Sequence, residues 1–169
     1  ESLVIGTGGD VYVTGWTESS DFPTTPGAYD TALNGLRDVF LTRLDGTVSS
    51  LRASTYLGGT DSDKGYSLAL DKEGNVLVTG GTWSSDFPAT PGAYDISFNG
   101  GHSDVFVSRF KSDLTGLFAS TFLGGTKDDV AKYLAVDASG SVFVTGDTWS
   151  KDFPTRKDSY DTSFNGGNE

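Results

Sequence analysis

Apolar and small polar residues alternate along short stretches of this chain, and glycine-containing turns separate these stretches. Residues 66–71 alternate in this way, a turn follows at 72–75, and residues 76–80 alternate again. Successive side chains of a strand point to opposite faces, so this pattern predicts a β-hairpin. No window keeps the 3.6-residue apolar period of an amphipathic helix, and we therefore expect few helices.

The same pattern predicts strands along the whole chain. They span residues 2–6, 10–15, 38–45, 51–57, 66–71, 75–80, 104–110, 117–123, 132–137 and 141–147. A long loop with prolines separates the second strand of each group from the third, and it is the longest stretch without a strand pattern.

Whole segments of the chain recur at a fixed spacing. Residues 21–30 return as 86–95 with one substitution, and a degraded third copy occupies 152–161. Residues 52–60 return with small changes as 118–126. By direct count the period is about 65 to 66 residues, and repeats of this kind are typical of propellers and repeat arrays.

Four strands per repeat is the number in one blade of a β-propeller. The sequence therefore predicts an all-β propeller fragment with four-stranded antiparallel blades: blade 1 at residues 1–60, blade 2 at 61–126, and a partial blade 3 at 127–169 with two strands and its long loop. A propeller closes with at least about four blades. Expected partners are thus the remaining blades of a longer parent chain or further copies of this one, which would cover the open faces and edges.

The charge of the chain excludes two classes of partner. It has 12 Lys+Arg and 23 Asp+Glu, a net charge of -11, without the basic clusters that bind nucleic acid or an anionic membrane surface. No apolar run approaches the ~18 residues of a membrane-spanning helix. We expect no nucleic-acid partner and no membrane insertion. The absence of Cys also excludes disulfides and thiolate metal sites.

Several co-linear motifs resemble those of the bacterial β-propeller repeat family, whose repeats are of the seven-bladed-propeller type. The family's units carry a D-F-P-T-T-P-G-A-Y loop, a D-V-F-V strand, an S-T-Y-L-G-G strand and a D-x-x-G-N-x-Y-V-T-G hairpin. The matching segments here are Asp21 to Tyr29, Asp104 to Val107, Ser54 to Gly59 and Asp71 to Gly80. The resemblance covers nearly the whole chain. It implies a propeller fold in an exported or cell-surface bacterial protein without a catalytic role.

Two units depart from the family's motifs. Gly6 stands in the first hairpin where the family has Asp, and Arg-Lys-Asp-Ser at 156–159 replaces Thr-Pro-Gly-Ala in the third loop. A function carried by that loop would therefore not extend to the third unit.

The turns between successive blades are acidic, and in a propeller they share one rim with the long loops. Asp61 and Asp63 have the alternate spacing at which two carboxylates can reach one hard cation, whereas the next unit has adjacent Asp128 and Asp129. No Glu follows at EF-hand distance. Calcium is the cofactor that these four residues could hold; the alternative is a solvated acidic turn with no cofactor.

Aromatic residues flank each long loop and could form a ligand or partner rim that stacks on sugar rings. The candidates are Phe22, Phe87, Tyr29 and Tyr94, with Phe153 and Tyr160 in the third copy, and also Trp83 and Trp149, which align with Glu18 rather than with Trp16. The alternative, which we favour, is that these side chains fasten the loop onto its blade, because a long loop needs buried anchors to stay ordered.

Catalytic chemistry has little support in the sequence. His102 is the only His and lies in a loop segment one residue longer than its counterpart, so a Ser–His–Asp arrangement would depend on a single surface residue. The Gly-Gly step after Leu57 follows a strand and opens no helix, unlike a phosphate-binding loop. The acidic residues mostly repeat with the units, whereas a glycosidase pair would be singular. We expect that the protein is not an enzyme.

These observations together predict a structural or interaction module, extracellular or at the cell surface, that presents its loops to protein or glycan partners, as in adhesion. The alternative is a carbohydrate- or calcium-dependent binding module that uses the same acidic rim.

Overall fold

The computed structural model describes residues 1–166, and the end of the predicted third blade, residues 167–169, lies outside them. The strands are β1 (Ser2–Ile5), β2 (Val11–Thr17), β3 (Asp38–Leu44), β4 (Leu51–Leu57), β5 (Asp63–Leu70), β6 (Val76–Thr82), β7 (Asp104–Phe110), β8 (Leu117–Leu123), β9 (Asp129–Val136) and β10 (Val142–Thr148). Within residues 1–166 there is no helix, and hence none that could cross a bilayer.

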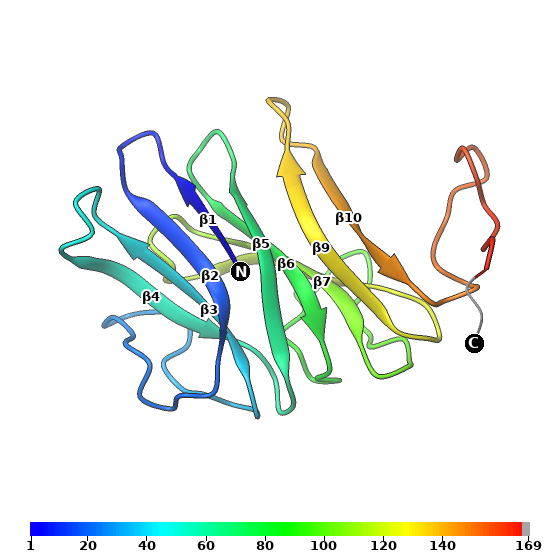
Figure 1. Ribbon diagram of the computed structural model, residues 1–169, viewed down its shortest axis with the longest axis horizontal. Coiled ribbons are helices and arrows are strands. Elements are labelled where there is room, and N and C mark those ends of the chain that lie inside the picture. The colour runs from blue at the N-terminus through cyan, green and yellow to red at the C-terminus, as the bar shows by residue number, and fades with distance from the viewer. Residues whose placement is uncertain (167–169) are drawn as a thin grey trace.

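The strands form three antiparallel sheets that follow one another along the chain. The first has the order β1-β2-β3-β4, the second β5-β6-β7-β8, and the third consists of β9 and β10. We call the first two sheets blade 1 and blade 2 and the last pair, with its loop, unit 3. Figure 1 shows the sheets side by side, with the β1–β2, β5–β6 and β9–β10 hairpin turns at one end. The predicted all-β propeller fragment is confirmed.

Two strands begin three residues earlier than the alternation predicts, β5 at Asp63 and β9 at Asp129. Residues 63–65 pair with β6 and residues 129–131 pair with β10, beyond a register shift in each pair that interrupts the alternation. Each strand start also contacts the preceding blade. The N–H of Asp63 donates to the carbonyl of Arg37 at 2.7 Å, and the N–H of Asp129 donates to the carbonyl of Ser103 at 2.8 Å. The first residue of each extended strand is thus also bonded to the unit before it.

The hydrophobic core lies between the blades. Val39 and Leu41 point from blade 1 toward blade 2, and Phe106 and Phe110 point from blade 2 toward blade 1; all four are buried. Full burial of a large apolar side chain contributes about 1.5–3 kcal/mol. The full cluster contains Tyr12, Val39, Leu41, Ala53 and Leu57 of blade 1, and Leu68, Val76, Val78, Phe87, Phe106, Phe110, Leu114 and Phe122 of blade 2.

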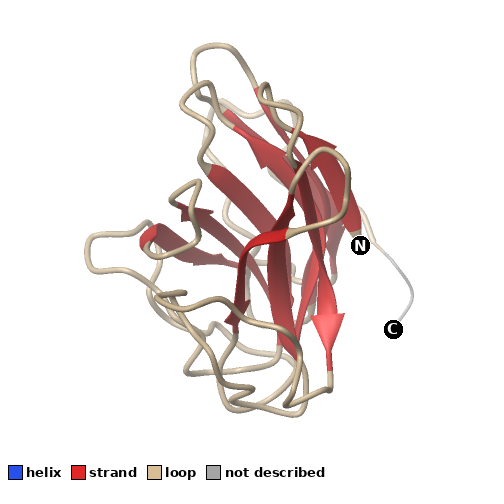
Figure 2. Cartoon of the chain, turned by 90° about the vertical axis from the view of Figure 1, so that its left-hand side faces the viewer, coloured by secondary structure: helices blue, strands red, loops and turns tan. Residues whose placement is uncertain are grey.

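Each long loop runs back along the outermost strand of its own blade. The N–H of Thr25 donates to the Ser54 carbonyl at 3.1 Å, and the Thr25 hydroxyl accepts from the Ser54 N–H at 3.0 Å. Further along, the N–H of Tyr56 donates to the carbonyl of Asp30 at 3.1 Å. Blade 2 repeats these bonds. The loops, which gather at the lower end in Figure 2, therefore cover strand edges that would otherwise be open.

A phenylalanine from each loop also inserts into its blade. Phe22 stacks on Phe40 with ring centroids 4.6 Å apart, and Phe87 stacks on Phe106 at the same distance. Phe87 is 3% exposed. These rings hold the long loops in place.

Removing this anchor should destabilise the protein. We expect Phe87→Ala to lower the free energy of unfolding by about 3–5 kcal/mol, because it leaves a cavity beside Phe106. The control Tyr94→Ala changes the other aromatic of the same loop, which is 72% exposed, and should cost less than about 0.5 kcal/mol. Urea unfolding followed by fluorescence measures both; equal effects would contradict the anchoring role.

Candidate functional site: the junctions between blades

The turn that joins blade 1 to blade 2 contains two glycines, Gly58 and Gly59, between β4 and β5. A Cβ on Gly58 would lie 2.5 Å from Oδ1 of Asp38 and 2.9 Å from Oδ2 of Asp63. A side chain at this position would therefore collide with both carboxylates. Glycine allows the turn to pass between them.

We call Asp38 and Asp63 the acidic pair of the first junction. Both residues are fully buried. Oδ2 of Asp63 accepts hydrogen bonds from the Gly59 N–H and the Ser84 hydroxyl, each 2.8 Å long. Its Oδ1 has no partner within residues 1–166. Asp38 accepts two bonds from backbone N–H groups of the preceding loop, at 2.8 and 3.3 Å.

The second junction repeats the arrangement with Asp104 and Asp129, which are again fully buried. Oδ2 of Asp129 accepts from the Gly125 N–H and the Ser150 hydroxyl, each at 2.7 Å. Asp104 accepts one backbone bond where Asp38 accepts two, because the loop before it is one residue longer. Oδ1 of both carboxylates lacks a partner in the described part of the chain.

A third aspartate at each junction forms hydrogen bonds with the turn between the two units. Asp86 opens the Asp-Phe-Pro motif of blade 2, and its Oδ1 accepts bonds from the N–H and hydroxyl of Thr60 at 2.9 and 3.0 Å. Asp152 accepts the corresponding bonds from Thr126, both at 3.0 Å. The repeated loop motif of one unit is thus hydrogen-bonded to the turn that leaves the preceding unit, and the two lie at one rim as predicted.

The acidic pairs carry no compensating positive charge, since no ion pair within residues 1–166 involves them. Burial raises the pKa of Asp63 to about 6 and that of Asp104 to about 6. Burial also raises the pKa of Asp38. A buried carboxyl favours its neutral form, and a second carboxylate nearby adds to this preference. Each junction therefore favours a bound proton as the pH falls toward 6.

The four predicted calcium ligands do not share one exposed loop. Asp63 and Asp129 are the first, buried residues of β5 and β9, whereas Asp61 is exposed and Asp128 half-buried on the rim. Sequence spacing suggested alternate carboxylates in an extended turn, but strand formation turns one of each pair inward. Among the described residues, no group of three or more acidic or His side chains could hold a metal ion.

The two predicted rim tryptophans have different surroundings. Trp83 is half-buried, with the Lys64 ammonium 5.1 Å from its ring centre and 5.6 Å from that of Trp16. Trp149 is 54% exposed. It lines a cavity of about 770 Å³ together with Gly101, His102, Thr126, Lys127, Asp128, Lys151, Phe164, Asn165 and Gly166.

The two predicted rim tyrosines, Tyr29 and Tyr94, also differ in their surroundings. The ring of Tyr29 packs edge-on against Phe110 of the next blade at 5.4 Å, and its N–H donates to the Leu114 carbonyl at 3.0 Å. Tyr94, its counterpart in blade 2, is 72% exposed. The structure therefore brings Trp149 and Asp128 to one cavity and places Phe22, Phe87 and Tyr29 against the blades.

Sequence reasoning did not identify the serines that complete each junction. Ser84 and Ser150 donate to Asp63 and Asp129, yet a serine in a polar loop resembles any solvated residue. Their recurrence two residues before Asp86 and Asp152 was the available signal.

Comparison with known proteins agrees with this geometry. A family model described as beta-propeller repeat matches the chain at two places, residues 54–88 and 120–154. Each match begins in the fourth strand of one unit and ends at the Pro of the Asp-Phe-Pro motif of the next, so each contains the turn, the following hairpin and the junction serine. A search of curated proteins found no match.

The buried carboxyls make stability depend on pH in an unusual direction. Their pKa of about 6 in the folded protein exceeds the value of about 3.9 in the unfolded chain. The folded state therefore binds more protons, and the free energy of unfolding should fall as the pH rises from 4.5 to 7, by about 2 kcal/mol for each carboxyl. Urea unfolding across this range measures the slope.

Two variants test whether Asp63 contributes to this pH dependence of stability. Asp63→Asn should remove about half of it, leaving the part due to Asp104, and raise stability at pH 7, because the amide keeps a hydrogen-bond acceptor and carries no charge. Asp45→Asn is the control: hydrogen bonding, chiefly from Ser49, lowers the pKa of Asp45 to about 2, below the range tested, so the slope should remain. Stability that is constant or rises between pH 4.5 and 7 would contradict the assignment.

Proposed function

We propose that this chain, two segments of which match the beta-propeller repeat model, is a non-enzymatic structural and interaction module that works by stacking blades. The observation that carries the proposal is the use of the repeated motifs. They form the junctions between units.

This function is supported by an exposed face of blade 1 that resembles the faces buried between blades. Leu3 of β1 is 65% exposed, whereas Leu68 and Leu134, which occupy the same position in the next two units, are 5% and 9% exposed. Leu68 is covered by blade 1. The face of blade 1 that points away from blade 2 thus presents the residue type that is buried at each junction.

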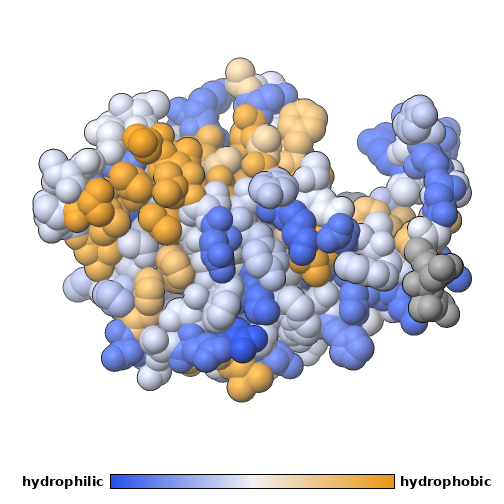
Figure 3. All heavy atoms as spheres, viewed as in Figure 1, coloured by the Kyte–Doolittle hydropathy of each residue, from blue (hydrophilic) through white to orange (hydrophobic). Residues whose placement is uncertain are grey.

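We define the N-face as this surface of blade 1, lined by Leu3, Val13 and Phe40 around a groove of about 490 Å³. Val78 and Phe106 occupy the positions of Val13 and Phe40 in blade 2 and are fully buried. Apolar side chains gather over β1 and β2 in Figure 3. A contiguous exposed apolar surface of this kind favours a protein partner.

The partner that fits the N-face is another blade, supplied by the parent protein or by a second copy of this chain. The face it would present is the one that blade 1 turns toward blade 2. We further propose an extracellular or cell-surface location, based on the resemblance of the motifs to repeats of exported bacterial proteins. Adhesion or assembly of a surface array suits a rigid scaffold with loop-rich rims.

Charging the N-face should prevent association. We expect the chain to associate with increasing concentration in multi-angle light scattering, and Leu3→Glu to shift it toward the monomer with little loss of stability, because Leu3 is largely exposed. Leu36→Glu is the matched control, since Leu36 is 70% exposed in a loop outside the N-face. A wild-type chain that stays monomeric, or an equal effect of both substitutions, would contradict the proposal.

A second candidate function, glycan binding at the rim, is favoured by the cavity at Trp149. An exposed indole stacks well on sugar rings, and the neighbouring Lys127, His102 and Asn165 supply hydrogen-bond donors. Calcium could assist at two carboxylates of this rim, the exposed Asp61 and the half-buried Asp128, since carboxylate oxygens are its preferred ligands.

A glycan array probed with and without a calcium chelator tests this candidate. Binding should be lost in Trp149→Ala and retained in Trp16→Ala, which removes a tryptophan of β2 that does not line the cavity. Loss of signal with chelator alone would assign a role to calcium. An array without signal in either condition would remove glycan binding from consideration.

A further inference from the structure

We propose that the groove between the β1–β2 and β5–β6 turns binds a small organic anion with an apolar body. The groove has a volume of about 580 Å³ and lies at the end of the molecule where the hairpin turns gather, away from the long loops (Figure 1). Clefts of this size commonly hold small-molecule ligands. Its walls belong to blades 1 and 2, each of which has four strands. The inference goes beyond the proposed function, which concerns the stacking faces and the loop rim.

A glycine makes room in this groove. Gly6 stands where the hairpin turns of the next two units have Asp71 and Asp137. A Cβ on Gly6 would lie 3.2 Å from the Tyr12 ring and 3.4 Å from Leu70, so an aspartate side chain would occupy part of the groove. The corresponding groove of the second junction has Asp71 in this place and is smaller, at about 320 Å³.

The floor of the groove is apolar. Tyr12 is 5% exposed and belongs to the core between the blades, and Val4 and Leu70 pack against that core. All three side chains line the groove. An apolar ligand body would therefore leave water on entering it, which favours binding.

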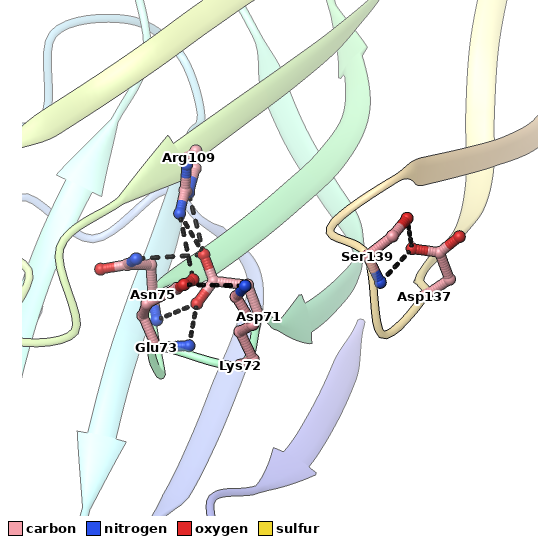
Figure 4. Close-up of polar contacts among 7 residues, drawn as sticks. All are labelled: Asp71, Lys72, Glu73, Asn75, Arg109, Asp137 and Ser139. Carbon is pink, nitrogen blue, oxygen red and sulfur yellow. Dashed lines mark hydrogen bonds and ion pairs between the residues drawn. The ribbon is translucent and has the colours of Figure 1, made fainter.

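The carboxylate that blade 2 contributes to the groove is already fully hydrogen-bonded. Oδ1 of Asp71 accepts from the N–H groups of Glu73 and Asn75 at 3.0 and 2.8 Å. Its Oδ2 accepts from the Asn75 side chain at 3.0 Å and from Nε of Arg109 at 2.9 Å. Figure 4 shows Asp71 held in this way within its turn. This carboxylate is not available to a cationic ligand.

The carboxylate that blade 1 contributes is neutralised by an arginine. Oδ2 of Asp10 accepts from Nε of Arg43 at 2.7 Å and lies 2.6 Å from Nη2 of the same guanidinium. The Arg43 Nη1 group makes only a long bond of 3.3 Å to the carbonyl of Ser112. Each carboxylate of the groove thus has its own arginine.

Two hydrogen-bond donors of the groove remain, the Tyr12 hydroxyl and the Lys72 ammonium. Burial raises the pKa of Tyr12, so its hydroxyl keeps its proton near neutral pH. Lys72 contacts Glu73 at 3.7 Å, with side chains 68% and 53% exposed, and such a surface pair contributes little. A carboxylate accepts from both kinds of donor, and with an ammonium it forms a charge-assisted bond. The groove therefore favours an anion over a cation.

The test is an NMR titration of the full chain with hexanoate, and with hexylammonium as a cation of similar size. Hexanoate should cause saturable shifts of the amide signals of Gly6, Leu70 and Gly74, and hexylammonium should not. Gly6→Asp should abolish these shifts, because the new carboxylate takes up space and repels the ligand. Its melting temperature should not fall, since Asp occupies this position in the next two units.

Further variants separate the groove from nonspecific charge effects. Lys72→Ala should weaken hexanoate binding by about threefold or more, as expected for one exposed ion pair. Ser85→Asp and Lys127→Ala make the same charge changes at exposed positions of the loop rim and should leave binding as it was. Hexanoate without effect, an equal response to hexylammonium, or full binding by Gly6→Asp would overturn the inference. Should Gly6→Asp lower the melting temperature, unchanged binding by Lys72→Ala would overturn it instead.

Discussion

Apolar burial between neighbouring blades is the interaction on which the rest of this structure depends. A four-stranded sheet has two faces, and one sheet cannot cover both of its own. In blade 2, both Val78 and Leu77 are buried although they point to opposite faces, because a neighbour lies on each side. Blade 1 has one neighbour, and Leu3 on its other face is exposed. Stability therefore belongs to the stack of units more than to any single unit.

The junctions fix the position of each blade relative to the next. Apolar faces alone would let two blades slide, because the hydrophobic effect is not directional. Buried carboxylates at Asp63 and Asp129, each held by one backbone N–H and one serine hydroxyl, set a single geometry. Burial of the Asp63 and Asp104 carboxyls raises their pKa and lowers stability near neutral pH, so the junctions exchange some stability for specificity.

The repeat and its alternation predicted most of the fold from the sequence. Strand periodicity and the recurrence of Asp21–Asp30 were enough to predict the blades and the loop rim, because both features arise from patterns within one unit. The extension of β5 to Asp63 could not be predicted in this way, since the register shift between Gly65 and Ser67 breaks the alternation and Asp63 bonds to Arg37 of another blade.

The candidate site was predicted less well for the same reason. Spacing placed Asp61 and Asp63 together as rim residues, but their environments differ because Asp63 enters a strand. Ser84 gave no sign of its role, which is defined by a partner 21 residues earlier. Residues that form contacts between units recur with the repeat. Their recurrence shows that a position matters, but it does not show which residue of the neighbouring unit is contacted.

Hydrogen exchange across the blade interface tests the central account most directly. Phe106→Ala in blade 2 removes a buried ring that faces blade 1, a change that costs about 3–5 kcal/mol in typical cores. If the blades stabilise one another, the protection of amides in β2 and β3 of blade 1 will fall together with that in β6 and β7. Undiminished protection in blade 1, with loss confined to blade 2, would contradict the account.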